Sequence, residues 1–137
     1  MAKEFERDLK ADQNAPEEIE KKLNSSRERI LAAPAIIIVN VDLSEMDHYP
    51  DERRNKAEYL MAAQSVANAG MQMLLAAHAE GVGSVWVCSP LFAQEAVQKA
   101  LGLPKTWEPH AMIFLGYANT ITNKRERKLQ EDVVVRR

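Results

Sequence analysis

Residues 35–41 (AIIIVNV) limit the possible folds more than any other segment of this sequence. They form a run rich in β-branched residues with the length of a strand, and it is apolar without clean alternation. A run of this kind is typical of a strand that is covered on both faces of its sheet. We therefore predict a central strand in a sheet that is flanked by helices.

Helical segments are expected on both sides of this strand. The first helix is expected to start at Asn14 and Pro16, a cap and a first-turn proline, and to end before Pro34. Residues 51–80 carry apolar side chains at three- and four-residue steps, which predicts a long helix that Gly81 ends. The remaining expected elements are strands at 84–88 and 111–117 and a helix at 91–101.

The composition is that of a single globular domain, residues 1–137. Hydrophobic residues make up 46% of the chain and charged residues 28%. The formal net charge of −2 argues against a dedicated nucleic-acid binder, whose affinity would come from counterion release. Polar residues interrupt the longest apolar stretch, 60–79, which argues against a membrane span. Residues 1–10 lack the apolar core of a signal peptide and the chain has one cysteine, so we expect a cytoplasmic protein.

Two features predict a homodimer. Small residues near the middle of the long helix would let another helix approach closely; they are Ala62, Ala63, Ala67, Ala69 and Gly70. In addition, the valines at 133–135 form a β-prone run with no obvious mate in the chain.

No motif assigns a catalytic side chain or a metal site. Residues 81–84 (GVGS) lie between a helix and a strand, the wrong order for a dinucleotide-binding fingerprint, and are interpreted as a helix end and a tight turn. The histidines have no carboxylate or thiol at metal-ligand spacing, so they are expected to have ordinary surface or second-layer roles. They are His48, His78 and His110.

Two other places are candidates for ligand binding. Cys88 follows an expected strand and precedes Ser89, at the carboxyl end where open α/β sheets place ligands. No base is visible near the thiol, so the backbone amides of this turn are interpreted as the working groups. Arg125 and Arg127 lie two residues apart in an extended segment and could grip a phosphate together, with a solvated basic tail as the alternative.

Residues 70–89 (GMQMLLAAHAEGVGSVWVCS) and 95–118 (EAVQKALGLPKTWEPHAMIFLGYA) place a helix, a glycine turn, a strand, a helix, an L-G-L-P turn and a G-Y strand end in one order. This pattern resembles the C-terminal half of the nitroreductase family of flavin enzymes, over residues 26–135. Within that family it looks most like the nitroreductase-type domain attached to the coenzyme F420 gamma-glutamyl ligase. The shared L-G-L-P-x-x-W-E-P turn carries this closer likeness.

The resemblance implies an α/β (α+β) fold of three layers, with helices around a mostly antiparallel sheet. It also implies FMN bound at the interface of a two-fold homodimer. Such enzymes transfer hydride from a reduced nicotinamide, NAD(P)H, or a deazaflavin, F420, to a small electron-poor substrate. The flavin performs this chemistry, so no catalytic side chain is expected.

Carried over by position, the resemblance also implies the binding residues. The isoalloxazine would be lined by Trp86, Val87, Cys88 and Ser89, with the N–H groups of the last two at its N5 and O4 edge. Arg125 and Arg127 would bind the FMN phosphate. The C-terminal arm, residues 118–137, would be exchanged between subunits, with valines 133–135 adding a strand to the partner's sheet.

The sequence lacks one feature of the family. An arginine-rich opening, commonly R-R-S-x-R, supplies flavin contacts in family members, and these 137 residues do not contain it. We therefore expect an N-terminally truncated nitroreductase fold. The alternative is a flavin-free dimerisation or binding module derived from that fold.

Overall fold

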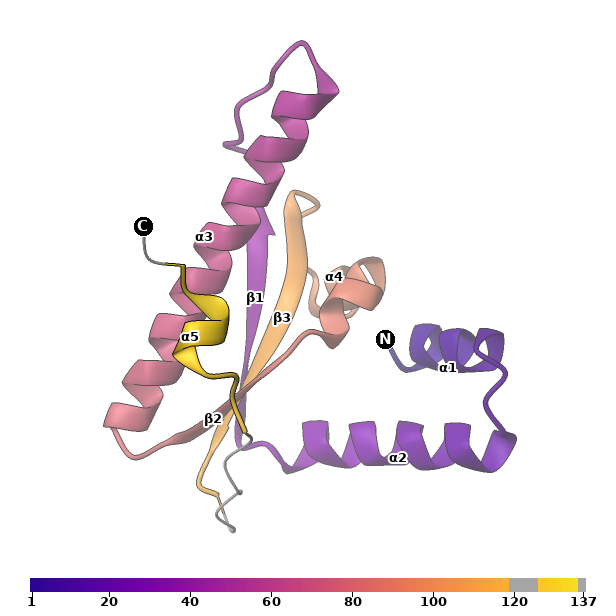
Figure 1. The fold of residues 1–137 in the computed structure, drawn as a ribbon. Helices are drawn as coiled ribbons and strands as arrows, with labels where there is room; N and C mark the ends of the chain where they lie inside the picture. Colours follow the sequence, from indigo (N-terminus) through magenta and orange to yellow (C-terminus); the bar gives the residue numbers. More distant parts are fainter. Residues whose placement is uncertain (119–125, 136–137) are drawn as a thin grey trace.

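A three-stranded antiparallel sheet between helices forms the body of the protein (Figure 1). The computed structural model describes residues 1–118 and 126–135. The elements are α1 (Ala2–Ala11), α2 (Pro16–Ala32), β1 (Ala35–Asp42), α3 (Glu52–Ala79), β2 (Gly83–Val87), the 3-10 helix η1 (Ser89–Phe92), α4 (Gln94–Leu101), β3 (Trp107–Gly116) and α5 (Gln130–Val133). The predicted fold class, helices around a mostly antiparallel sheet, is confirmed.

The order of the strands corrects one prediction. The sheet runs β1-β3-β2, so β3 is the central strand, and β1 pairs with β3 alone in the described part of the chain. The prediction of a central strand at 35–41 was therefore wrong. An apolar run shows that side chains are buried, as Val39 and Val41 are, but it does not show how many strands pair with the backbone.

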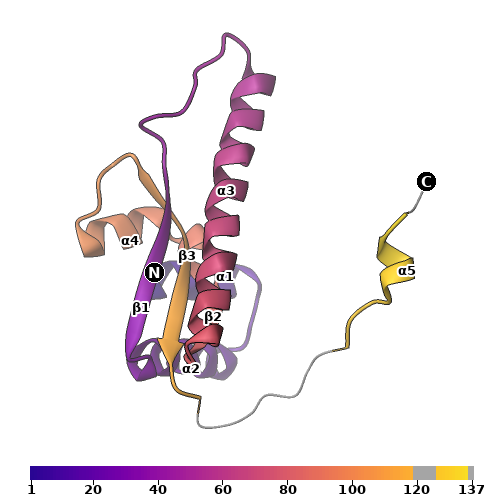
Figure 2. The same ribbon diagram turned by 90° about the vertical axis from the view of Figure 1, so that its left-hand side faces the viewer.

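Helices cover the two faces of the sheet. Figure 2 shows α3 along one face and α4 on the other. On the α3 side, the buried core consists of Val39, Ala111 and Ile113, against which Val66, Met73 and Leu74 of α3 pack. No helix among the described residues, including the 28-residue α3, is long and apolar enough to cross a membrane.

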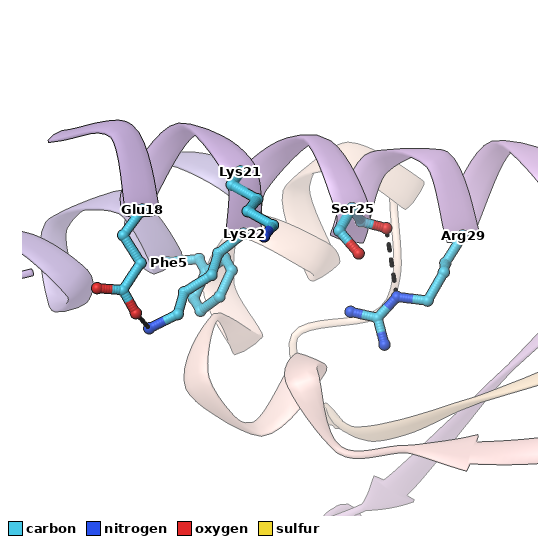
Figure 3. A pocket seen from close by; sticks show the side chains of 6 residues that line it. All are labelled: Phe5, Glu18, Lys21, Lys22, Ser25 and Arg29. Carbon is cyan, nitrogen blue, oxygen red and sulfur yellow. Dashed lines mark hydrogen bonds and ion pairs between the residues drawn. The ribbon is translucent and has the colours of Figure 1, made fainter. Parts of the chain in front are cut away.

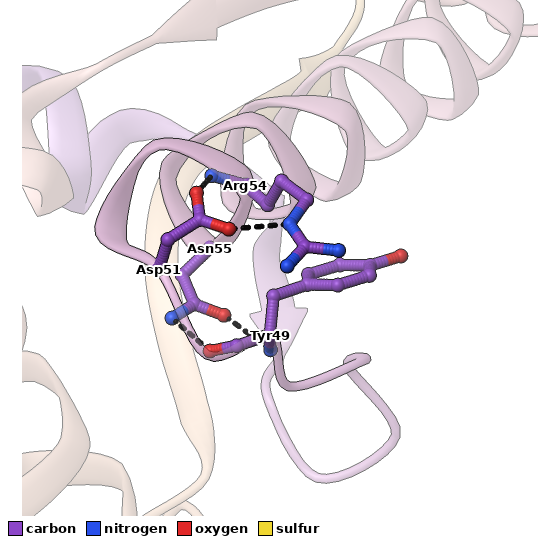
Figure 4. A network of polar contacts seen from close by, with 4 residues as sticks. All are labelled: Tyr49, Asp51, Arg54 and Asn55. Carbon is purple, nitrogen blue, oxygen red and sulfur yellow. Dashed lines mark hydrogen bonds and ion pairs between the residues drawn. The ribbon is translucent and has the colours of Figure 1, made fainter.

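A network of polar contacts fixes the start of α3 (Figure 4). The Asp51 carboxylate accepts a hydrogen bond from the Arg54 backbone N–H at 3.0 Å and pairs with the Arg54 side chain, which holds the pKa of Asp51 below its usual value. The Arg54 guanidinium lies 4.9 Å from the centre of the Tyr49 ring. Asn55 makes two hydrogen bonds to the Tyr49 backbone, so the loop before α3 is tied to its first turn.

The N-terminal residues differ from the prediction. Residues 2–11 form α1, which the sequence analysis did not predict, and it packs on α2; Leu9 of α1 and Ile19 of α2 are buried. Asn14 does not cap α2, whose N-cap is Ala15. The Asn14 side chain instead donates to the Leu9 carbonyl at 3.0 Å, because the carbonyls of the last turn of α1 lack partners within that helix.

The other end of α3 follows the prediction closely. Gly81 has φ +74°, and its N–H donates to the His78 carbonyl while the Val82 N–H donates to the Ala77 carbonyl at 2.8 Å. This pair of bonds is the Schellman arrangement, which places a left-handed residue directly after the helix. The helix predicted at 91–101 is instead divided into η1 and α4, because the backbone of Ala93 is not helical, with φ −152° and ψ 39°.

We expect Gly81→Val to destabilise the protein by about 1 kcal/mol or more, because a β-branched residue is strained at this positive φ. A Cβ at this position would meet no atom within 4 Å, so the loss would come from the backbone alone. Chemical denaturation measures it. Gly81→Asn is the matched control, since Asn tolerates the left-handed region better, and equal losses for the two variants would contradict the explanation.

Candidate functional site

The turn after β2 presents two adjacent backbone donors. Cys88 is exposed, with φ −85° and ψ 6°, and Ser89 begins η1. The Cys88 carbonyl accepts from the Leu91 N–H at 3.0 Å, and the neighbouring Pro90 is buried, so this hydrogen bond and this packing contact fix the turn. Within the described residues, the N–H groups of Cys88 and Ser89 donate no hydrogen bond. A ligand with acceptor atoms along one edge could therefore bind here.

The other two residues predicted for this site lie on opposite faces of the sheet. Trp86 faces α3, where a Cβ added at Gly70 would lie 2.1 Å from its Cζ3 atom. Its indole Nε1 lies 3.0 Å from Cys88 Sγ. Val87, the next residue in the strand, points to the other face. The close approach predicted for Gly70 is thus made by Trp86 of the same chain rather than by another helix.

The C-terminal residues are exposed. Arg127 lies in the irregular segment before α5 and makes no ion pair with another described residue, and Arg125 lies outside the described residues. Val133 ends α5 instead of beginning a strand, and Val134 follows in an extended conformation. The exposed fractions of Val133, Val134 and Val135 are 61%, 45% and 83%. These three valines are therefore not packed in the core of their own chain.

A polar cluster that the sequence analysis missed joins α3 to β3. The Tyr59 hydroxyl donates to Glu108 Oε2 at 2.8 Å and lies 3.2 Å from His110 Nε2. The β1–β3 register passes from Val39–Ala111 to Asn40–Pro109, which leaves His110 as the extra residue of a β-bulge. Such a bulge re-aims a side chain, here toward Tyr59. Burial raises the pKa of Tyr59 to about 12, and the hydrogen bond to Glu108 acts in the same direction.

No metal centre is built from the described residues, among which no three His, Cys, Asp or Glu side chains converge.

Comparison with known families identifies the chain: residues 1–117 match the Nitroreductase family. The chain belongs to the nitroreductase family. The family resemblance of the sequence is thereby confirmed, while the closer likeness to the ligase-attached domain stays a prediction.

Solved structures of nitroreductase-like proteins share the fold. The BluB-like flavoprotein from Clostridium difficile 630 is 18% identical with a TM-score of 0.69, covering 98% of this chain and 70% of that one. The nitroreductase-like family protein from Bacillus cereus is 21% identical with a TM-score of 0.58, and the match covers 98% of this chain and 66% of that one. The nitroreductase family protein cd3355 from C. difficile 630 is 24% identical with a TM-score of 0.56, and the match covers 77% of this chain and 60% of that one. The chain thus spans about 60% of the length of this last relative.

The Tyr59 cluster predicts how the stability of this nitroreductase-family chain depends on pH. Folded Tyr59 keeps its proton to about pH 12, whereas the unfolded side chain loses it near pH 10.0. The folded state therefore binds more protons between these values, and the free energy of unfolding falls as the pH rises through them. Denaturation of wild type and Tyr59→Phe at a series of pH values measures this contribution.

We expect Tyr59→Phe to lack this part of the alkaline decline and to lose about 1 kcal/mol at pH 7, because the bond to Glu108 is removed. Tyr117→Phe is the matched control, since Tyr117 is 81% exposed. Identical alkaline curves for wild type and Tyr59→Phe would show that the cluster does not stabilise the fold.

Proposed function

We propose that the chain acts as an FMN-dependent oxidoreductase, transferring hydride from a reduced nicotinamide or a deazaflavin to a small electron-poor acceptor. The N–H groups of Cys88 and Ser89, which donate no hydrogen bond to any residue that the structure describes, carry this proposal, because they occupy the position that the family resemblance assigns to the flavin edge. Membership of the nitroreductase family and the fold shared with a BluB-like flavoprotein support it. The acceptor is a small molecule, and no nucleic acid or membrane is involved.

The residues present suit such a cofactor. FMN, when bound, supplies the hydride chemistry. The Cys88 and Ser89 N–H groups would hold its polar ring edge, and donors that are fixed before binding stabilise negative charge without having to reorient. Their direction is set by the end of β2 and by the buried Pro90. Arg127 would contribute a charge-assisted contact to the phosphate, together with Arg125.

The second candidate function is a flavin-free dimerisation or binding module. The placement of Trp86 favours it, because the partly buried indole packs against α3 at Gly70. On this alternative the chain would bind no flavin under any condition.

A proline substitution at Cys88 distinguishes the two proposed functions. Cys88→Pro removes one N–H at a φ of −85°, close to the range of proline, while Cys88→Ala keeps it. We expect the purified chain to be colourless or partly loaded with FMN. In a titration followed by flavin fluorescence, the FMN affinity of Cys88→Pro should be about tenfold below that of Cys88→Ala.

The phosphate contact is tested in the same titration. Arg127→Ala should weaken FMN binding by about tenfold or more, since a hydrogen bond to a charged group is stronger than a neutral one. If none of the proteins binds FMN, the flavin-free alternative stands. If FMN binds equally to Cys88→Pro and Cys88→Ala, the donors at this turn do not hold the ring.

We further propose that the chain forms a homodimer. Exposed apolar side chains along the outer surface of α3 support it: Leu60, Met61, Met71 and Leu75 are each about half exposed, between 49% and 61%. A helix face of this kind is stabilised when a second surface covers it. The exposed Val133, Val134 and Val135 fit an arm that pairs with the partner's sheet.

Removal of residues 129–137 tests the exchanged arm. We expect the full chain to be a dimer by light scattering at high micromolar concentration. The chain that ends at Lys128 should be a monomer, because the strand pairing and the burial of the valines are lost together. A full chain that is monomeric, or a shortened chain that stays dimeric, would show that the arm does not hold subunits together.

A further inference from the structure

Residues of α2 and one residue of α1 line an open groove that lies outside the proposed flavin site (Figure 3). Its volume is about 360 Å³, within the range of small-molecule sites. Its lining consists of Phe5 from α1 and of Glu18, Lys21, Lys22, Ser25 and Arg29 from α2. The two helices contact each other, and each has one buried side chain, Leu9 in α1 and Ile19 in α2.

Positive charge predominates in this groove. Lys22 is engaged, because its Nζ lies 2.8 Å from Glu18 Oε1 and donates to Asn14 Oδ1 at 2.8 Å. Arg29 uses only its Nε, which donates to the Ser25 carbonyl at 3.3 Å, and its terminal amino groups are available. No carboxylate in the described part of the chain pairs with Lys21 or Arg29. The single acid of the groove is thus already neutralised, and two cations remain.

The geometry of these groups favours one class of ligand. Lys21 and Arg29 are eight residues apart on α2, which separates their backbones by about 12 Å along the helix axis. Phe5, at 38% exposure, offers an apolar aromatic surface at the Lys22 end of the groove, away from Arg29. An aromatic ring can stack on such a surface, while phosphate oxygens accept bonds from guanidinium and ammonium groups. A compound with an aromatic base at one end and phosphates at the other would satisfy both parts.

We propose that the groove between α1 and α2 is a binding site for a nucleotide, with the phosphates at Lys21 and Arg29 and the base at Phe5. This proposal does not rest on flavin binding at the Cys88 turn. The two sites share no residue, so each can fail without the other.

Titration calorimetry with ADP tests the proposal. ADP should bind, adenosine and inorganic phosphate should each bind at least about tenfold more weakly, and affinity should fall with added salt because charges are screened. Arg29→Gln and Lys21→Gln should each weaken ADP binding by about fivefold or more. Arg27→Gln is the matched control on the same helix, since Arg27 does not line the groove, and it should change the affinity less than twofold.

A second variant separates the base from the phosphates. Phe5→Leu keeps an apolar side chain in α1 but removes the ring, so it should weaken ADP and leave the affinity for inorganic phosphate unchanged. Circular dichroism checks that the helices persist in each variant. No binding of ADP up to about 1 mM, or equal losses for Arg27→Gln and Arg29→Gln, would overturn the proposal. Loss of ADP binding in Cys88→Pro would place the nucleotide at the flavin site instead.

Discussion

The packing of α3 against the sheet is the contact on which the rest of this structure depends, and it requires that one residue of α3 have no side chain. Trp86 reaches the α3 backbone at Gly70, where a Cβ would lie 2.1 Å from the indole. Overfilling a packed core costs about 1–3 kcal/mol, so this position tolerates no larger residue without a shift of the helix. Because Trp86 also contacts Cys88 two residues later, the packing that anchors α3 also sets the direction of the proposed flavin-binding turn.

Local chemistry made most elements of the fold predictable, and long-range pairing accounts for two of the errors, the start of β3 and the order of the strands. Gly81 could be predicted because a glycine after a long helix satisfies a local backbone requirement. β3 begins at Trp107, four residues earlier than predicted, because Glu108 and Pro109 do not read as strand residues and become so by pairing with β1. The strand order was missed for the same reason, since hydropathy reports burial and not the identity of the neighbouring strand.

One part of the candidate site could likewise be predicted from the sequence, and the other could not. The turn at Cys88 could be found from the sequence because its position, directly after a strand, is itself the signal. The Tyr59 cluster could not, because Tyr59 and Glu108 are 49 residues apart and a bulge turns His110 toward them. A bulge adds one residue to a strand and leaves no mark in hydropathy. A turn of consecutive residues can therefore be located from the sequence more readily than a cluster of distant side chains.

Net charge illustrates a related limit. The value of −2 correctly describes the whole chain, yet it says little about any one surface, because charges farther apart than about 10 Å are largely screened from one another in salt. What decides the sign of a surface is which acids are already paired. On the N-terminal helices, for example, Glu6 pairs with Lys10 and Glu18 pairs with Lys22, each with a neighbour one turn away. Of the charged residues that line the groove between α1 and α2, Glu18 is paired with Lys22, while Lys21 and Arg29 have no carboxylate partner among the described residues, so this lining is positive in a chain of slight overall negative charge.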